Sequence, residues 1–245
     1  MIKIVVAGSN GRMGKRIIAL LSEEIDCKLI GGLDIDTDEK TANELIKSCD
    51  VVIDFSSPEA TITLLDKCKE HKKAIVIGTT GFDENQKETI KDYANEIPCV
   101  FSPNMSVGVN VFFALLKKAA SFLKEYDTEI VETHHNKKKD SPSGTALKLA
   151  DIIVEANDGN KKLIYGRKGN VGERKSDELC IHAVRMGDVV GEHSVFFAAN
   201  NERIEITHKA HSRDNFAKGS IVAAKWIANK PNGAYDMFDV LNIER

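Results

Sequence analysis

The sequence contains 245 residues, of which 42% are hydrophobic and 29% charged, a composition typical of a globular protein with one large or two modest domains. The 34 basic residues nearly balance the 37 acidic ones, and the resulting net charge of −3 argues against a general affinity for nucleic acid. No apolar run is as long as a membrane span, the N-terminus reads as a strand and not a signal peptide, and the five cysteines are widely spaced, so we expect a cytoplasmic protein with reduced thiols and no membrane partner.

The first third of the chain has the pattern of a dinucleotide-binding fold. Residues 2–7 predict a buried strand, which the turn Gly8–Gly14 follows, then a helix to about Leu21 and a strand over residues 28–33 that ends at Asp34. Glycines let the backbone approach a pyrophosphate, and an acid about 20 positions further on accepts hydrogen bonds from ribose hydroxyls. The spacing is G-x-x-G-x-x-G and not the usual G-x-G-x-x-G, with Asn10 in the turn; asparagine tolerates left-handed backbone. The alternative is an ordinary turn, but the flanking strand and acid favour a cofactor site.

The alternation of strands and helices continues to about residue 101. We expect strands over residues 51–55, 74–77 and 99–101, and helices over residues 58–70 and 83–95. In an open parallel sheet, ligands bind beyond the carboxyl ends of the strands. Several polar or glycine-rich segments follow such ends: Gly8–Gly14, Asp34, Phe55, Gly78–Thr80 and Ser102–Met105. Some of them can be plain loops, but their shared edge favours cofactor binding.

The pattern then changes to a mixture of longer elements. We expect helices over residues 107–124, 143–156, 216–228 and 235–241, strands over residues 129–133, 179–184, 194–199 and 203–207, and a surface loop over residues 157–176. This order predicts an α+β second domain with an open mixed sheet. Such a sheet must bury its second face, and self-association is one way to do so.

The stretch from Thr133 to Ala146 is the strongest candidate site. It places His134 and His135 beside three lysines, and Ser143 then predicts the N-cap of a helix. Histidine exchanges protons near neutral pH, and the amides of Gly144 and Thr145 at a helix N-terminus favour an anion. The alternative is a solvated basic loop before a capped helix, which is the more frequent explanation of lysine runs.

These residues resemble the dihydrodipicolinate reductase family, whose enzyme is also called 4-hydroxy-tetrahydrodipicolinate reductase. The resemblance rests on motifs that run in order through nearly the whole chain: Gly8–Gly14, Gly78–Phe82, Asn104–Asn110, Thr133–Ala146, Val190–His193 and Ile206–Ala210. The His-His…Lys…Asp-x-Pro-Ser-Gly-Thr block is specific, whereas the glycine turn is not.

The resemblance implies an α/β fold with two domains. A Rossmann-like dinucleotide-binding domain would comprise residues 1–106 and 214–245, and residues 107–213 would bind substrate and form a homotetramer. His134 and Lys138 would transfer protons, while His135, Gly144 and Thr145 would hold the substrate carboxylates. The cofactor would contact Gly8, Ser9, Asn10, Gly11, Arg12, Met13, Asp34, Gly78, Thr79, Thr80, Ser102, Pro103, Asn104 and Met105. Met105 replaces a phenylalanine common in the family, and both side chains are apolar.

The expected reaction is NAD(P)H-dependent reduction of a cyclic imine dicarboxylate, with loss of its hydroxyl as water, in lysine and diaminopimelate biosynthesis. We expect NADH to serve at least as well as NADPH, because Asp34 disfavours a 2′-phosphate and Ile35 stands where NADPH-preferring members often have arginine; Arg12 argues the other way. No metal is expected. His208 and His211 are expected to be structural, whereas Arg213 is a weaker candidate for holding a carboxylate. Two alternatives are another two-domain Rossmann oxidoreductase acting on a small acid and a non-enzymatic nucleotide sensor.

Overall fold

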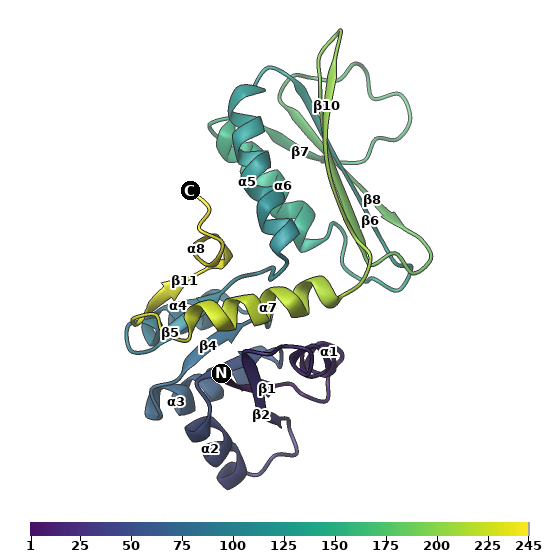
Figure 1. The fold of residues 1–245 in the computed structure, drawn as a ribbon. Coiled ribbons are helices and arrows are strands. Elements are labelled where there is room, and N and C mark those ends of the chain that lie inside the picture. Colours follow the sequence, from purple (N-terminus) through teal and green to yellow (C-terminus); the bar gives the residue numbers. More distant parts are fainter. Residues whose placement is uncertain (245) are drawn as a thin grey trace. The chain divides into compact units, whose positions relative to one another are not determined.

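The computed structural model describes residues 1–244, and these residues form two compact units (Figure 1). The first unit comprises Met1–Val107 together with the chain from Asp214 onward, and the second comprises Gly108–Arg213. The two ends of the chain therefore contribute to one unit, and the middle of the chain forms the other.

The first unit is built on a six-stranded sheet in the order β11-β5-β4-β3-β1-β2, and every pairing in it is parallel. Its strands are β1 (Ile2–Ala7), β2 (Cys27–Leu33), β3 (Val51–Asp54), β4 (Ala74–Ile77), β5 (Pro98–Phe101) and β11 (Gly233–Tyr235). Its helices are α1 (Arg12–Leu21), α2 (Glu39–Ser48), α3 (Pro58–Glu70), α4 (Glu84–Ala94), α7 (Asp214–Ile227) and α8 (Met237–Val240). The expected Rossmann-like fold is confirmed.

Helices cover both faces of this sheet, which explains why its strands are apolar without interruption. In β1, Ile4 and Val6 pack in one core cluster with Ile17 of α1 and Ile221 of α7. Val5 and Ala7 point to the opposite face and pack in a second cluster with residues of α2, α3 and α4. Successive side chains of a strand alternate between the faces, so one strand serves both cores.

Three details of the first unit differ from the sequence-based expectation. No element was expected between Asp34 and Val51, but α2 forms there. Asp38 is its N-cap, because the Asp38 side chain accepts a hydrogen bond from the Thr41 amide. The helix expected over residues 235–241 is shorter, because Gly233–Tyr235 instead pairs with β5 as strand β11. Asp236 then caps α8 through a capping box.

The second unit contains a five-stranded mixed sheet in the order β10-β9-β6-β8-β7. Its strands are β6 (Asp127–His134), β7 (Lys162–Tyr165), β8 (Glu178–Arg185), β9 (Gly191–Ala198) and β10 (Arg203–Ala210), and its helices are α5 (Val107–Phe122), which starts at the last residue of the first unit, and α6 (Gly144–Ala156). Strand β7 lies inside residues 157–176, which were expected to be a loop, so that expectation was wrong for four residues. The expected open mixed sheet is confirmed.

The two faces of this second sheet differ. Within residues 108–213, Figure 1 shows α5 and α6 on the same side of the sheet, and α6 packs on β6 and β8. Along β6, burial alternates, so Thr128, Ile130, Glu132 and His134 are buried while the residues between them are partly exposed. The face that carries Glu132 is therefore the one covered by helix, and Glu129 lies on the other face.

Candidate active site

The glycine turn after β1 is shaped by backbone contacts that leave no room for side chains. Gly8 has a φ of +74°, and a Cβ atom on it would lie 2.3 Å from the Phe55 carbonyl oxygen. A Cβ on Gly14 would lie 2.2 Å from the Gly8 carbonyl oxygen. These contacts bring the backbone of β1, α1 and β3 close together. Side chains at these two positions would collide with backbone atoms, so glycine is required there, and this tight turn is the candidate cradle for a pyrophosphate.

Asp34 is tied to the same turn. Its carboxylate accepts a hydrogen bond from the Asn10 amide at 2.7 Å and one from the Ile35 amide at 2.9 Å. These two backbone hydrogen bonds lower the pKa of Asp34. Asn10 was expected to suit the turn because asparagine tolerates left-handed backbone. Its backbone lies outside the left-handed region, so that expectation was wrong. Asp34 therefore holds the turn in shape as well as presenting a negative charge at the end of β2.

The ends of β3 and β4 are joined by a buried acid that the sequence analysis did not single out. Asp54 is fully buried and accepts hydrogen bonds from the hydroxyls of Ser56, Thr61 and Thr79. Burial raises the pKa of Asp54, and the hydroxyl donors oppose that rise. Asp54 thereby holds the side chain of Thr79, one of the expected cofactor residues, through a hydrogen bond.

The remaining expected cofactor residues also lie at the carboxyl edge of the first sheet. A Cβ on Gly78 would lie 2.2 Å from the Phe55 ring, so a larger residue there would require the ring to move. Ser102 and Met105 are buried, and the Ser102 hydroxyl donates to the Asn104 carbonyl. The buried side chains of this edge shape its loops, and Thr80 and Asn104 remain at least partly exposed there.

In the second unit, His134 is the last residue of β6 and belongs to a buried ionic cluster. Its Nδ1 lies 2.5 Å from Glu132 Oε2, and Glu132 is completely buried. Arg185 of β8 donates to both oxygens of Glu132 at 2.8 Å, and the Ser143 amide donates to Oε1 at 3.1 Å. Burial alone would raise the pKa of Glu132, but the hydrogen bonds from His134 and Arg185 outweigh it and lower this pKa to about 2.

Ser143 connects this cluster to helix α6. It is the N-cap of the helix, as expected, because its hydroxyl accepts a hydrogen bond from the Ala146 amide. The same hydroxyl lies 2.9 Å from His193 Nε2. Burial, with the nearby His134 as the next cause, lowers the pKa of His193 to about 3, so His193 is neutral at physiological pH. The His193 ring packs edge-on against His134, with 5.1 Å between the ring centroids.

The loop between His134 and α6 carries the other expected residues. Lys138 forms an ion pair with Asp140, with Nζ 2.8 and 2.9 Å from the two carboxylate oxygens. This hydrogen bond from Lys138 lowers the pKa of Asp140. Gly144 is the first residue of α6, and it is exposed, since a Cβ there would meet no atom within 4 Å. His135 precedes the loop, and Thr145 follows Gly144.

The expected residues thus fall into two sets. Every expected cofactor residue lies in the first unit, and His134, His135, Lys138, Gly144 and Thr145 all lie in the second unit. Asp54, Glu132 and Arg185 were not among the expected site residues, and Asp140 and His193 lie in the family motifs but were given no role. His208, expected to be structural, lies on β10 opposite His193, and burial lowers its pKa.

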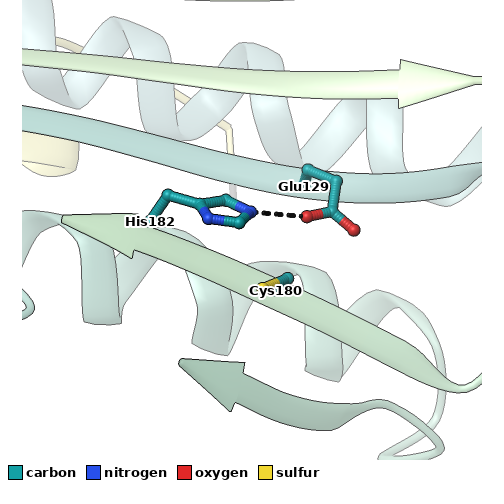
Figure 2. A group of neighbouring side chains, drawn as sticks. All are labelled: Glu129, Cys180 and His182. Atoms are coloured by element: carbon teal, nitrogen blue, oxygen red, sulfur yellow. Dashed lines mark hydrogen bonds and ion pairs between the residues drawn. The ribbon is translucent and has the colours of Figure 1, made fainter. Parts of the chain in front are cut away.

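A possible metal-binding group lies on the other face of β6. Glu129, Cys180 and His182 place one ligand atom each within 4.8 Å of one another (Figure 2). Glu129 already accepts hydrogen bonds from Arg167 and Arg174. Two guanidinium groups already compensate the charge of Glu129, so we interpret this group as an ion-pair network and not as a metal site.

Comparison with known proteins places the whole chain in one family. Residues 2–105 match the family model "Dihydrodipicolinate reductase, N-terminus", and residues 108–241 match "Dihydrodipicolinate reductase, C-terminus". The 4-hydroxy-tetrahydrodipicolinate reductase of Syntrophus aciditrophicus is 46% identical, with 98% of each chain covered. The enzyme of the same name from Syntrophotalea carbinolica is 45% identical over the full length of both chains.

Solved structures share the fold. The dipicolinate-bound dihydrodipicolinate reductase of Paenisporosarcina sp. TG-14 superposes with a TM-score of 0.81 at 23% identity, covering both chains completely. The diaminopimelate dehydrogenase of C. glutamicum superposes with a TM-score of 0.59 at 14% identity, covering all of this chain and 96% of that one. Within residues 1–244, no helix has the length and apolar character needed to cross a bilayer.

Proposed function

This chain belongs to the dihydrodipicolinate reductase family, and we propose that it reduces 4-hydroxy-tetrahydrodipicolinate to tetrahydrodipicolinate with a nicotinamide dinucleotide. The activity is that of an oxidoreductase of lysine and diaminopimelate biosynthesis. The observation that carries this proposal is the match over the full length of named relatives. The structure adds support, because the chain keeps a glycine cradle in one unit and a histidine–lysine segment in the other.

The first unit is proposed to bind the dinucleotide. The cradle around Gly8 and Gly14 has the close backbone approach that a pyrophosphate requires, and the N-terminus of α1 supplies amides there. Asp34 is proposed to accept hydrogen bonds from the adenosine ribose. When bound, the cofactor supplies the hydride for the reduction.

The second unit is proposed to bind the substrate and to move the protons. The amides at Gly144 and Thr145, with His135, are proposed to hold a carboxylate at the open N-terminus of α6. Overall, the substrate loses its hydroxyl as water and gains one hydride and one proton. His134 and Lys138 are proposed to assist departure of the hydroxyl and to supply the proton. Such acid catalysis typically contributes about 10²–10⁴-fold.

NADH is proposed to serve at least as well as NADPH. The Asn10 and Ile35 amides keep Asp34 ionised, and its charge would repel a 2′-phosphate. Ile35 is fully exposed beside it and offers no positive charge. The measurement is kcat/KM for both cofactors at matched, modest salt, since salt screens surface charges. A tenfold preference for NADPH would contradict this proposal and would identify Arg12 or a lysine as the phosphate partner.

The protein is proposed to be a cytoplasmic homotetramer. Strand β10 is an edge strand whose residues are mostly exposed, including Ile204, and an unprotected edge favours association with another chain. All five cysteines are unpaired and buried, which suits a reducing compartment. Light scattering coupled to size-exclusion chromatography should give four times the mass of the chain. A monomer at micromolar concentration would contradict this assembly.

The test of the activity uses the purified chain with enzymatically generated 4-hydroxy-tetrahydrodipicolinate. We expect the nicotinamide absorbance to fall only when the substrate, the reduced cofactor and the enzyme are all present. Oxidation of diaminopimelate with the oxidised cofactor is the control, because a diaminopimelate dehydrogenase shares the fold. Turnover of diaminopimelate and not of the cyclic imine would reject the proposed function.

A further inference from the structure

The inference concerns the buried carboxylate beneath His134, and it rests on the proposed function, in which His134 transfers a proton. Glu132 accepts hydrogen bonds from both terminal nitrogens of Arg185 and from the Ser143 amide, and the remaining contact of its carboxylate is His134 Nδ1 at 2.5 Å. We propose that Glu132 is a positioning residue, which holds His134 with its proton on Nδ1 and directs Nε2 to the substrate.

The donors around Glu132 determine which partner donates in the hydrogen bond between Glu132 and His134 Nδ1. A carboxylate that receives two N–H groups from an arginine and one from a backbone amide is ionised and can only accept. His134 must therefore donate from Nδ1, and the neutral ring carries no proton on Nε2. Nε2 is therefore the nitrogen available to take up and release the catalytic proton. In hydrolase triads an acid likewise holds Nδ1–H of the histidine, and Nε2 transfers the proton.

The surroundings of Nε2 support this assignment. Gly191 of β9 lies beside the ring, and a Cβ on it would come within 3.0 Å of His134 Nε2. The absence of a side chain at Gly191 leaves Nε2 unobstructed on that side. The Nδ1 side, in contrast, is closed by Glu132, Arg185 and the N-terminal end of α6.

The positive charges around the His134 ring oppose its protonation, and Glu132 offsets them. Arg185 of β8 and Lys138 of the following loop are positive, whereas His193 of β9 is neutral and burial lowers the pKa of His208 of β10. A proton arriving on His134 thus enters a region with two cations, of which Lys138 is already paired with Asp140. Glu132 is the carboxylate in contact with the ring, and its charge offsets this repulsion.

The chain contains a matched control for this proposal. Glu129 lies on the same strand but on the opposite face, and it also pairs with two arginines. Its histidine partner, His182, lies 2.9 Å away, and Figure 2 draws this contact. Burial opposes ionisation there too, and hydrogen bonds led by Arg167 lower the pKa of Glu129 to about 2. Glu129→Gln therefore breaks a comparable network in β6 without touching His134.

The experiment compares Glu132→Gln with Glu129→Gln in steady-state kinetics, at equal oligomeric state. We expect Glu132→Gln to lower kcat by on the order of 10²-fold, with the KM values for substrate and cofactor within about threefold of wild type. Glu129→Gln should keep kcat within about twofold. Glu132→Asp retains the charge and should recover part of the lost kcat. Equal losses in the two glutamine variants, or wild-type kcat in Glu132→Gln, would overturn the proposal.

A measurement on the unaltered protein makes the test independent of whether a variant folds. Nitrogen-15 NMR of labelled histidines, at a pH high enough for the ring to be neutral, reports which ring nitrogen carries the proton. His134→Gln assigns the signals. A proton on Nδ1 supports the proposal, and a proton on Nε2 refutes it.

His134→Gln also separates this inference from the proposed function. If His134→Gln keeps its kcat, the catalytic assignment of His134 fails. If His134→Gln loses kcat and Glu132→Gln does not, the proposed function stands and the role of Glu132 fails.

Discussion

At the scale of single residues, the partners of a buried acid decide its charge. Asp54 and Glu132 are both completely buried. The side-chain partners of Asp54 are neutral hydroxyls, and burial raises its pKa. Glu132 faces Arg185, and its pKa falls to about 2. One acid therefore organises loops at the edge of the first sheet, while the other carries a negative charge beside His134 at neutral pH.

Asp34 offers a residue-scale prediction about cofactor choice. Asp34→Asn removes the negative charge but keeps an oxygen that can accept the Asn10 amide. We expect the ratio of kcat/KM for NADPH to that for NADH to rise by about tenfold or more, because the repulsion of a 2′-phosphate disappears. Steady-state kinetics with both cofactors measure this ratio. An unchanged ratio would show that Asp34 serves the turn and not the choice of cofactor.

A second residue-scale prediction concerns the N-terminus of α6. Thr145→Val keeps the size of the side chain but removes its hydroxyl. We expect KM for the substrate to rise roughly tenfold or more, because a hydrogen bond to a charged group is worth about 1.5–3 kcal/mol. Affinity for NADH, measured by fluorescence titration, is the internal control and should be unchanged. Weaker NADH binding with an unchanged substrate KM would reassign Thr145 to the cofactor.

At the scale of elements, the N-caps of α3 and α6 form an informative pair. The Ser57 hydroxyl accepts the Ala60 amide at the surface, whereas the buried Ser143 hydroxyl accepts the Ala146 amide and also contacts His193. Ser57→Ala should destabilise the fold by about 1 kcal/mol. Ser143→Ala should cost more, since it also leaves His193 Nε2 without this partner. Chemical denaturation of both variants measures the difference, and equal losses would contradict it.

Glu132 of strand β6 predicts that the second unit loses stability in acid. Hydrogen bonds lower the pKa of Glu132 from 4.5 to about 2 in the folded chain. The associated stability is present above 4.5 and is lost as the pH falls toward 2, and for Glu132 it amounts to about 3 kcal/mol. The unfolding free energy should therefore fall steeply over this range. Denaturation series at several pH values should show a shallower fall in Glu132→Gln; an unaltered slope would mean that the carboxylate does not titrate with folding.

The elements also show which parts of the fold the sequence could predict. Strands with unbroken apolar runs and helices with clear caps, such as β1 and α3, were predicted nearly to their ends. Helix α2 was missed because Ile46 is its one buried residue, although Asp38 was a usable cap signal. The edge strands β7 and β11 were missed because pairing with a distant strand, and not a local pattern, defines such short segments.

The candidate site was predictable to a similar extent. The helix cap at Ser143 could be read from neighbouring residues, and the structure confirms it. Glu132 carried no local signal, because Arg185 lies 53 positions away along the chain. His193 meets Ser143 only through the pairing of β6 with β9. Partners that meet across a sheet have no fixed spacing in the sequence, so the supporting residues were missed while the segment they support was found.

At the scale of the whole molecule, the expected cofactor residues and the expected substrate residues belong to different units. We predict that NADH alone slows hydrogen exchange around Gly8–Gly14 and at the ends of β4 and β5 in the first unit. A dicarboxylate analogue alone should slow exchange over residues 134–146 in the second unit, because a ligand protects the groups whose opening it opposes. Mass spectrometry of peptides measures both effects. Protection by NADH centred on residues 134–146 would reverse the assignment of the units.

The return of the chain to its first unit after Arg213 has a consequence for its synthesis on the ribosome. Helix α7 fills one face of the first sheet, where Ala217, Ile221 and Ala224 join residues of β1 and β3 in the same core. Helix α1 covers part of that face, but the part that α7 covers stays open until all of Gly108–Arg213 has been translated, so the nascent chain exposes an apolar surface during that time. The second unit is contiguous in the chain and emerges whole before α7. A chain that ends near Arg213 would therefore contain the whole second unit, but its first unit would keep apolar surface exposed and would tend to aggregate.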